Sequence, residues 1–481
     1  MADLPSPPLL RLRSGEHRAL LVLGDLLASY ASVALAIYTW YRYQRYTLLA
    51  RGIPPRRVDL LLNVEVPWWF YLLPILWGVL IIELYDLHKA TNPKQTLRGI
   101  ALAVLIGILA YATIFLFYRN PNELPRVGVG AFLAYSAALT LLWRLLYLRI
   151  YATQGLMRRA LVVGAGKAGQ TLLKAYRQIH PAPFQIIGFI DDDPQKIGQE
   201  IEDIPVLGNS QQLPELLEKH RISEVIVAIT GEMRGETFQT LLDIQEQGID
   251  VIRMPSVYEE LLGRVPVQHL ESDWLIRSFV DEARVSGFYE LAKRLLDIIG
   301  GLVGMILCLL MAPIMSLAIW LESGRPILFA QARAGRGGKA FTMYKFRTMI
   351  TDAEADGQPR LAETNDPRVT RVGAFLRRTR LDEFPQFFNI LRGEMSLVGP
   401  RAERPELVAK FQRQIPFYRA RLLVKPGLTG WAQINYGYAS TVEETMVKLE
   451  YDLYYIKHRS LLMDLVILLR TVGTIFGLKG R

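Results

Sequence analysis

Two adjacent carboxylates, Asp382 and Glu383, stand among arginines in the stretch 376–386 (LRRTRLDEFPQ), and a Gly-Pro-Arg turn ending at Arg401 follows. Nearby positive charge favours the ionised form of a carboxyl group. An ionised carboxylate can attack phosphorus as a nucleophile, and arginines can hold phosphate oxygens in bidentate pairs. We therefore expect phosphoryl chemistry here, with Asp382 kept ionised by its cationic neighbours.

The positive charge of the chain is concentrated around this pair. Residues 325–425 carry 20 Lys and Arg against 10 Asp and Glu, a net +10 that equals the net charge of the whole chain. Such a local excess attracts an acidic substrate or the anionic face of a membrane. We expect no nucleic acid partner, because no nucleic-acid-binding motif is recognisable. The candidate phosphate-binding residues are Lys345, Arg347, Arg371, Arg401 and Glu403.

Local sequence predicts that the acidic pair begins a helix. Thr379-x-x-Asp382 fits a capping box. Apolar residues recur at helical spacing at Leu381, Phe384, Phe388 and Leu391. The carboxylates could therefore merely start a helix. A helix start does not exclude catalysis, because the helix dipole would help to keep Asp382 ionised, and both interpretations stay open.

Long apolar runs indicate that part of the chain lies in lipid. Hydrophobic residues make up 51% of the chain and charged residues only 21%. About 20 mostly apolar residues cross a bilayer as a helix. Four runs are long enough, at residues 19–40, 68–87, 100–118 and 129–151. From the flanking arginines we expect a four-helix transmembrane domain (1–157) with both ends in the cytoplasm.

A Rossmann-like parallel-sheet domain is predicted over residues 158–276. A buried strand at 160–163 leads directly into Gly164-x-Gly166-x-x-Gly169, a helix follows, and Asp191 ends the next strand. Gly164, Gly166, Gly169 and Asp191 form a possible nucleotide loop. The context fits dinucleotide binding, but we favour a nucleotide-binding fold that is kept as a regulatory or dimerising module.

A fifth apolar run covers residues 295–321 and contains Asp297 and Pro313. We predict a re-entrant membrane helix hairpin that is bent near Pro313, within a linker and membrane segment at 277–322. A kinked transmembrane helix is the alternative. The hairpin would keep a mixed α/β catalytic domain (323–481) on the cytoplasmic side. Lys293 and Arg294, beside the hairpin, are expected to meet lipid headgroups, and residues 460–477 to form an interfacial or a core helix.

Disulfide and zinc chemistry are not expected. Cys308 is the single cysteine of the chain, and the six histidines are scattered. These residues offer neither a pairing partner nor the ligand spacing of a zinc site.

Four motifs between residues 344 and 433 carry a resemblance: 344–349 (YKFRTM), 381–386 (LDEFPQ), 393–401 (GEMSLVGPR) and 425–433 (KPGLTGWAQ). In order and spacing they resemble the bacterial polyprenol-phosphate sugar-1-phosphate transferases. The whole chain is similar to the large monotopic form, of the undecaprenyl-phosphate galactose or glucose phosphotransferase type. One departure is visible, because the family usually has Pro where Ala402 follows Arg401.

The resemblance implies a role for each motif residue. Asp382 would attack the β-phosphate of UDP-galactose or UDP-glucose, expel UMP and hold an aspartyl phospho-sugar. Glu383 would help to bind Mg²⁺. Undecaprenyl phosphate would then attack, in the first membrane step of exopolysaccharide, capsule or O-antigen synthesis. The implied phosphate or nucleotide contacts are Lys345, Arg347, Arg371 and Arg401.

Other functions remain open at this point. A membrane-tethered NAD-dependent UDP-sugar dehydratase or epimerase would explain the glycine loop. A nucleotide-sensing membrane scaffold would bind UDP-sugar without turnover, and a sugar-only transferase would release UDP. The oligomeric state also stays open, with a homodimer among the possibilities.

Overall fold

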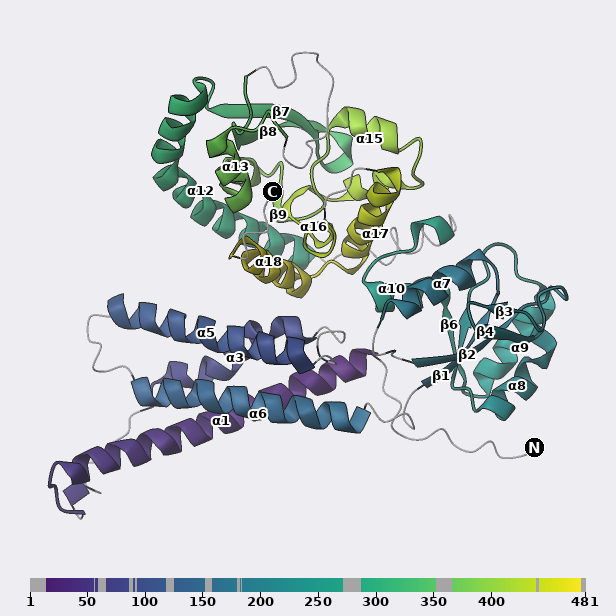
Figure 1. Ribbon diagram of the computed structural model, residues 1–481, viewed down its shortest axis with the longest axis horizontal. Helices are drawn as coiled ribbons and strands as arrows, with labels where there is room; N and C mark the ends of the chain where they lie inside the picture. Colours follow the sequence, from purple (N-terminus) through teal and green to yellow (C-terminus); the bar gives the residue numbers. More distant parts are fainter. Residues whose placement is uncertain are drawn as a thin grey trace. The chain divides into compact units, whose positions relative to one another are not determined.

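The computed structural model describes residues 14–55, 57–58, 66–85, 90, 93–117, 125–151, 158–179, 182, 184–270, 287–351, 366–437 and 441–476. The chain divides into two compact units. One comprises Met1–Ala165, Leu173–Val227 and Gly235–Val251, and the other comprises Gly166–Leu172, Ala228–Arg234 and Ile252–Arg481. Figure 1 labels the elements within them. Each unit is described by itself.

Three long apolar helices form most of the N-terminal bundle: α1 (Ser14–Ala50), α5 (Pro93–Phe117) and α6 (Arg126–Tyr151). The predicted runs 19–40 and 129–151 fall within α1 and α6, and 100–117 of the run 100–118 falls within α5, while residue 118 lies outside the described residues. Together with α12 (Gly287–Ser323), they are the four described helices that are long and apolar enough to cross a membrane. The prediction of a membrane protein is confirmed. Three of the four predicted spans form long apolar helices, and the fourth such helix, α12, covers the fifth apolar run, the predicted re-entrant hairpin.

The predicted span at 68–87 does not form one helix. The described part consists of a 3₁₀ helix η1 (Trp68–Leu72), a short helix α3 (Leu73–Leu80) and a 3₁₀ helix η2 (Ile82–Tyr85). Pro74 lies in the first turn of α3. Proline lacks the N–H that a continuing helix needs and fits best at a helix start, so the chain restarts there. The prediction of a continuous span here is wrong.

A buried ion pair joins two helices of the bundle. Arg144 on α6 contacts Asp25 on α1 at 2.6 Å and donates to the Leu84 carbonyl oxygen at 2.8 Å. Charged side chains inside a membrane bundle are costly unless they are paired, and this pairing accounts for their presence in apolar helices.

The predicted parallel sheet is present. Its strands are β1 (Arg158–Val163), β2 (Phe184–Ile190), β3 (Glu200–Ile201), β4 (Ile204–Gly208), β5 (Glu224–Val227) and β6 (Asp250–Arg253), in the order β3-β4-β2-β1-β5-β6. β1 pairs in parallel with β2 and β5, and β2 with β4, whereas β3 is antiparallel to β4. Without the short β3, the order corresponds to 3-2-1-4-5, as in doubly wound nucleotide-binding folds. The accompanying helices are α7 (Lys167–Arg177), α8 (Leu213–His220) and α9 (Gly235–Glu246).

The C-terminal α/β part contains two small sheets. β7 (Leu328–Ala334) pairs antiparallel with β8 (Ala340–Phe346), and β9 (Ser396–Val398) pairs in parallel with β10 (Gly427–Thr429). The surrounding helices are α10 (Met254–Leu262), α13 (Arg371–Thr379), α14 (Gln386–Arg392), α15 (Pro405–Phe411), α16 (Trp431–Asn435), α17 (Val442–His458) and α18 (Leu461–Phe476). A core of aliphatic and aromatic side chains joins them. This part thus has the predicted mixed α/β character.

The fifth apolar run forms α12, which continues unbroken from Gly287 to Ser323 with Pro313 inside it. The predicted interruption near Pro313 is therefore absent, because a single internal proline removes one hydrogen bond and can bend a helix without ending it. Figure 1 shows α12 as a curved helix along one side of the C-terminal part. Re-entry into the membrane stays a prediction.

Both halves of α12 pack on the C-terminal part. In the first half, close approach at Gly300, Gly301 and Gly304 brings α12 against Leu397, Ile390, Leu391 and Phe387. In the second half, Met315 and Ile319 pack with Phe346 and Leu376. Lys293 donates to Asp464 at 2.9 Å, and Arg294 donates to the Ile390 and Leu391 carbonyl oxygens at 2.8 Å. The expectation that Lys293 and Arg294 meet lipid headgroups is therefore corrected, because both side chains donate their hydrogen bonds to acceptors within the protein.

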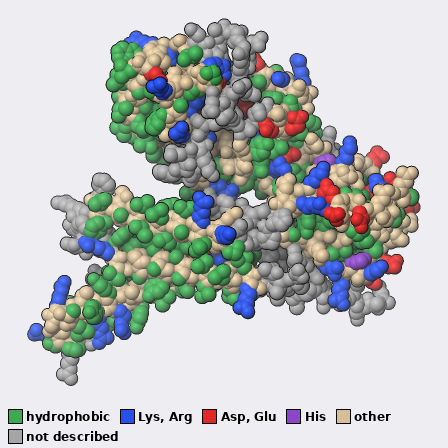
Figure 2. All heavy atoms as spheres, viewed as in Figure 1, with side chains coloured by type: hydrophobic (Ala, Val, Ile, Leu, Met, Phe, Trp, Pro, Cys, Tyr) green, Lys and Arg blue, Asp and Glu red, His purple; other side chains and the backbone are tan. Residues whose placement is uncertain are grey.

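The outer face of α12 is apolar. Exposed hydrophobic residues include Leu291, Leu295, Ile306, Leu310, Ile314 and Leu321. In Figure 2, hydrophobic side chains gather over this side of the C-terminal part. Helix α18 has one buried face, with Asp464 and Ile467, and one exposed apolar face, with Leu462 and Leu465. The interfacial and core interpretations of this helix thus each describe one face.

Candidate active site

The acidic pair lies in a connection between two helices. α13 ends at Arg380, whose backbone is left-handed (φ 61°), and the 3₁₀ turn η9 (Leu381–Glu383) follows before α14. Thr379 Oγ1 donates to the Phe375 carbonyl oxygen at 2.9 Å, within the last turn of α13. The predicted capping box is therefore wrong, since Thr379 closes one helix and does not open the next.

Three of the sequence motifs meet at this turn. Asp382 and Glu383 are each only 8% exposed. Lys345 Nζ on β8 lies 3.0 Å from Glu383 Oε1, and Arg401 Nη2 lies 3.4 Å from the same oxygen. Two cations on one buried carboxylate compensate its charge and leave an excess of positive charge, which can attract phosphate oxygens.

The two carboxylates have opposite protonation tendencies. Burial, with the adjacent negative charge of Glu383, raises the pKa of Asp382. Burial alone would also raise the pKa of Glu383, but Lys345, Arg401 and Arg380 outweigh it and lower that pKa. Desolvation acts more strongly on Asp382 than its cations do, so the pKa rises to about 6. That value still leaves the carboxyl group mostly ionised at neutral pH.

Arg401 is presented by a tightly packed strand pair. The Gly427 N–H donates to the Pro400 carbonyl oxygen at 2.8 Å, and the Gly399 N–H to that of Thr429 at 2.9 Å. A Cβ at Gly399 would lie 2.4 Å from the Lys425 carbonyl oxygen, and one at Gly430 would lie 2.1 Å from that of Gly399. These backbones approach too closely for any side chain, which explains the glycines of both motifs.

Asn389 aligns β8 with α14, and the motif comparison did not single it out. This fully buried side chain donates to the Thr342 carbonyl oxygen at 2.7 Å and accepts from the Tyr344 N–H at 3.3 Å. It therefore orients the strand that carries Lys345. The predicted apolar stripe of Leu381, Phe384, Phe388 and Leu391 lies on another side of the helix, so only the fold shows that Asn389 is buried and paired.

A cavity of about 270 Å³ opens at the cations and Glu383. Its walls are Arg333, Met343, Lys345, Glu383, Gln386, Met395, Arg401, Ala402, Gly427 and Leu428. Charged groups from three motifs thus face one concave space, which is the general form of a small-molecule site.

The other predicted phosphate-binding residues have different surroundings. Arg347 donates to the Ser323 and Gly324 carbonyl oxygens at 2.7 Å, where it closes the end of α12. Arg371 is exposed at the start of α13, and its backbone N–H donates to Glu322 at 2.7 Å. Glu403 faces Arg421 at 3.7 Å. Of the predicted set, the described contacts thus bring Lys345 and Arg401 to Glu383.

Comparison with known proteins adds to this geometry. Residues 288–477 match the bacterial sugar transferase family. The UDP-glucose:undecaprenyl-phosphate glucose-1-phosphate transferase of Xanthomonas campestris pv. campestris is 30% identical over 432 residues, which cover 84% of this chain and 86% of that protein. The chain belongs to the bacterial sugar transferases. The resemblance inferred from the motifs, and with it the enzyme class, is confirmed.

Two further relatives of this sugar transferase carry related names. The UDP-glucose:undecaprenyl-phosphate glucose-1-phosphate transferase of Escherichia coli (strain K12) is 34% identical over 66% of this chain and 67% of its own length. The UDP-N-acetylgalactosamine-undecaprenyl-phosphate N-acetylgalactosaminephosphotransferase of Aeromonas hydrophila is 40% identical over 51% of this chain, and the match spans 56% of that relative.

The glycine loop of the sugar transferase is hydrogen-bonded to Asp191, the acidic residue that follows β2. Residues 81–255 match a CoA-binding domain family. Gly164 has φ 110°, and Gly166 and Gly169 lead into α7. Asp191 accepts from the Ala165 N–H at 2.8 Å and from Lys196 at 3.1 Å. The carboxylate that would bind a ribose is thus paired within the domain, and the dinucleotide-binding and the regulatory or dimerising interpretations both stay predictions.

Two adjacent carboxylates fit a substrate-assisted Mg²⁺ site. Within the described part of the chain, no group of three or more His, Cys, Asp and Glu residues could hold a metal. Mg²⁺ usually takes one or two carboxylates and completes its shell with water and substrate phosphates. Glu383, with Asp382 beside it, can supply that limited donor set.

Proposed function

We propose that this sugar transferase moves a hexose 1-phosphate from a UDP-sugar to undecaprenyl phosphate and releases UMP. The observation that carries the proposal is the buried pair of Asp382 and Glu383, with Lys345 at 3.0 Å and Arg401 at 3.4 Å from Glu383. The names of the relatives support the class of donor and acceptor. UDP-glucose and UDP-galactose are the proposed donors.

The reaction proceeds in two displacements. An Asp382 oxygen attacks the β-phosphorus, the new O–P bond forms, and the bond to the bridging oxygen breaks so that UMP leaves. The acyl phosphate on Asp382 then holds the sugar phosphate. A phosphate oxygen of undecaprenyl phosphate attacks the same phosphorus, the Asp382–phosphorus bond breaks, and the carboxylate is restored.

The neighbouring residues act by charge and position. Lys345 and Arg401 bind the diphosphate oxygens and stabilise negative charge as it develops. Glu383, together with the substrate phosphates, would hold Mg²⁺, and the bound cation would neutralise charge on the diphosphate and leaving group. With its pKa raised to about 6, Asp382 is still mostly ionised at neutral pH, and cationic or metal charge that arrives with the donor would favour the ionised, attacking form further.

Helix α12 suits a substrate that has one end in lipid. Its exposed apolar face would lie in the cytoplasmic leaflet of the bacterial inner membrane, and both its halves pack on the domain that carries the site. The polyprenyl tail could then stay in lipid while its phosphate reaches Asp382. The product would begin a lipid-linked glycan of an exopolysaccharide, capsule or O-antigen.

The decisive experiment identifies the released nucleotide. Purified protein is incubated with undecaprenyl phosphate, Mg²⁺ and UDP-glucose, UDP-galactose or UDP-N-acetylgalactosamine, the last because of the Aeromonas relative. We expect UMP, loss of turnover in EDTA, and no UMP from a folded Asp382→Asn variant.

Other products would contradict the proposal in distinguishable ways. Release of UDP would indicate a sugar-only transferase. A change in nicotinamide absorbance with UDP-sugar would indicate a dehydratase or epimerase. Binding of every donor without any nucleotide release would leave the scaffold interpretation. Near-normal UMP release from folded Asp382→Asn would exclude Asp382 as the nucleophile.

A further inference from the structure

The loop behind Arg401 is held by its backbone. Ala402 follows Arg401 where the family usually has proline, and an alanine at that position restricts Arg401 less than proline would. The carbonyl oxygens of three consecutive residues, 401 to 403, accept hydrogen bonds from donors outside this loop. Arg421 Nη2 donates to the Arg401 oxygen at 3.1 Å, Arg333 Nη1 to the Ala402 oxygen at 3.0 Å, and the Ala334 N–H to the Glu403 oxygen at 2.8 Å.

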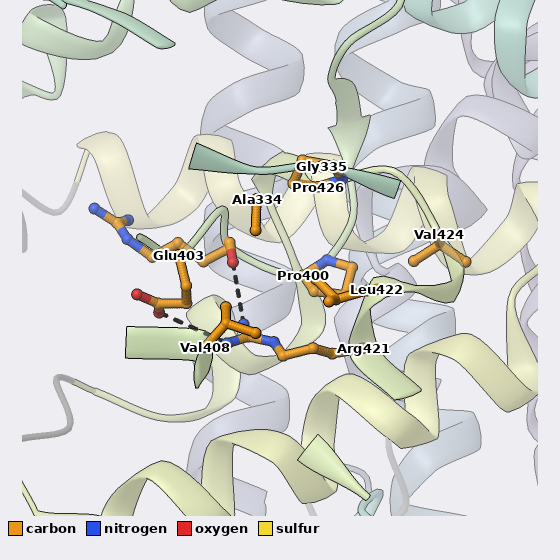
Figure 3. Close-up of a pocket in the computed structure, with 10 residues that line it drawn as sticks. Ala334, Gly335, Pro400, Glu403, Val408, Arg421, Leu422, Val424 and Pro426 are labelled. Carbon is orange, nitrogen blue, oxygen red and sulfur yellow. Dashed lines mark hydrogen bonds and ion pairs between the residues drawn. The ribbon is translucent and has the colours of Figure 1, made fainter. Parts of the chain in front are cut away.

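Arg421 is buried and firmly oriented. It is 7% exposed and lies in the 3₁₀ helix η10 (Tyr418–Leu423). Its Nη2 contacts Asp452 Oδ2 at 2.8 Å, and its Nη1 donates to the Tyr418 hydroxyl at 2.7 Å. Figure 3 shows its guanidinium pointing toward Glu403, with Arg421 and Pro400 on the wall of a cavity of about 240 Å³. A planar guanidinium with donors in a fixed fork can hold a carboxylate and a carbonyl oxygen together.

Arg401 connects this cluster to the acidic pair. Arg401 lines both the 240 Å³ cavity beside Arg421 and the 270 Å³ cavity at Glu383. Its backbone oxygen accepts from Arg421 on one side, and its guanidinium contacts Glu383 on the other. A displacement of the backbone at Arg401 would therefore move the cation that faces Glu383.

We propose that Arg421 is a positioning residue of the transfer reaction, which acts through Arg401 and is itself oriented by Asp452. The inference rests on the proposed function, because Arg401 must contact the donor diphosphate for its position to matter. Arg421 itself does not need to touch the substrate. Since a small misplacement of a catalytic group can cost about 10²-fold in rate, loss of this anchor should be visible in turnover.

A double-mutant cycle tests the proposal. The rate of UMP release is measured for the wild type, Arg421→Met, Arg401→Ala and the double variant. We expect Arg421→Met to slow the reaction by roughly 10²-fold, and to add little once Arg401 has been truncated. Losses that multiply in the double variant would overturn the proposal, because Arg421 would then act independently of Arg401.

A matched control separates positioning from general stability. Arg264 is a largely buried arginine of the same unit that contacts Glu450 at 3.4 Å. Arg264→Met should combine multiplicatively with Arg401→Ala, whatever its effect on melting temperature. If Arg421→Met does not fold, Arg421→Lys keeps a cation beside Asp452 but not the fork. Arg421→Lys should slow the reaction less than Arg421→Met, and this smaller loss should likewise almost disappear once Arg401 has been truncated.

The wild-type reaction tells the two failures apart. If the wild type releases no UMP from any donor, the proposed function fails, and the role of Arg421 in it fails as well. If the wild type releases UMP but the losses from Arg421→Met and Arg401→Ala multiply, only the positioning role fails.

Discussion

Asp382 and Glu383 are neighbours with the same exposure but opposite shifts of pKa. Both are buried, yet the described cation contacts at 3.0 and 3.4 Å go to Glu383. The negative charge this fixes on Glu383 adds to burial in raising the pKa of Asp382. Positive charge that enters the site with a donor would lower this pKa and favour the ionised form of Asp382 further.

The pH dependence of the first displacement tests this account. UMP formation should fall as the pH drops through a limb that lies above the ordinary range for an aspartate, because the protonated carboxyl cannot attack. Arg377 lowers the pKa of Asp382, so Arg377→Gln should raise that pKa and move the limb to higher pH. Single-turnover measurements at constant ionic strength would show the shift. A limb that stays in place or moves to lower pH contradicts this electrostatic account.

At the scale of elements, α12 is joined to the site by polar contacts as well as by packing. Asp297, in an otherwise apolar stretch, accepts from the Leu397 N–H at 2.8 Å and from Ser396 Oγ at 2.9 Å. Both donors belong to β9, the strand that leads to Arg401. Helix α12 thus fixes one side of the strand pair that presents Arg401.

Replacement of Asp297 separates this polar anchor from simple packing. Asp297→Leu leaves two buried donors without an acceptor, which typically costs about 1–3 kcal/mol for each group. We expect a lower melting temperature in detergent and reduced UMP formation. Asp297→Asn keeps an acceptor oxygen and serves as the matched control, with most of the stability retained. Equal behaviour of the two variants would show that these hydrogen bonds do not hold β9.

At the scale of the whole molecule, the arrangement of α12 bears on which side of the membrane the site faces. Near the start of α12, Lys293 contacts Asp464 of α18 at 2.9 Å. At the end of α12, the Ser323 hydroxyl accepts a hydrogen bond at 2.8 Å from Arg347, the residue that follows β8. Both contacts are made within the same unit of the chain. A straight crossing would require one of these polar contacts to lie on the far side of the membrane, so we predict that both ends of α12 are cytoplasmic.

Cysteine labelling in vesicles tests this prediction. Cys308, the single native cysteine, is first replaced by Ser. Gly287→Cys and Arg325→Cys then introduce one thiol at each end of α12. Both positions suit labelling, because Gly287 has open space around it and Arg325 is exposed. An impermeant maleimide should label both from the cytoplasmic side of the inner membrane. Labelling of one end only from the periplasmic side would establish a crossing helix.

The sequence alone was sufficient for whatever depends on residue type and local order. The four C-terminal motifs identified the family. Apolar length predicted α1, α5 and α6, and glycine spacing after a buried strand predicted the parallel sheet. These properties follow from local chemistry and from hydrophobic periodicity, which the chain carries in its linear order.

Tertiary structure alone decided which charges meet. Lys345 and Arg401 reach Glu383, while Arg347, from the same motif as Lys345, turns to the end of α12. It also decided that burial outweighs the arginines at Asp382, and that Pro313 does not interrupt α12. The physical reason is common to these cases. Desolvation and ion pairing depend on distances between segments far apart in the chain, and local pattern does not contain those distances.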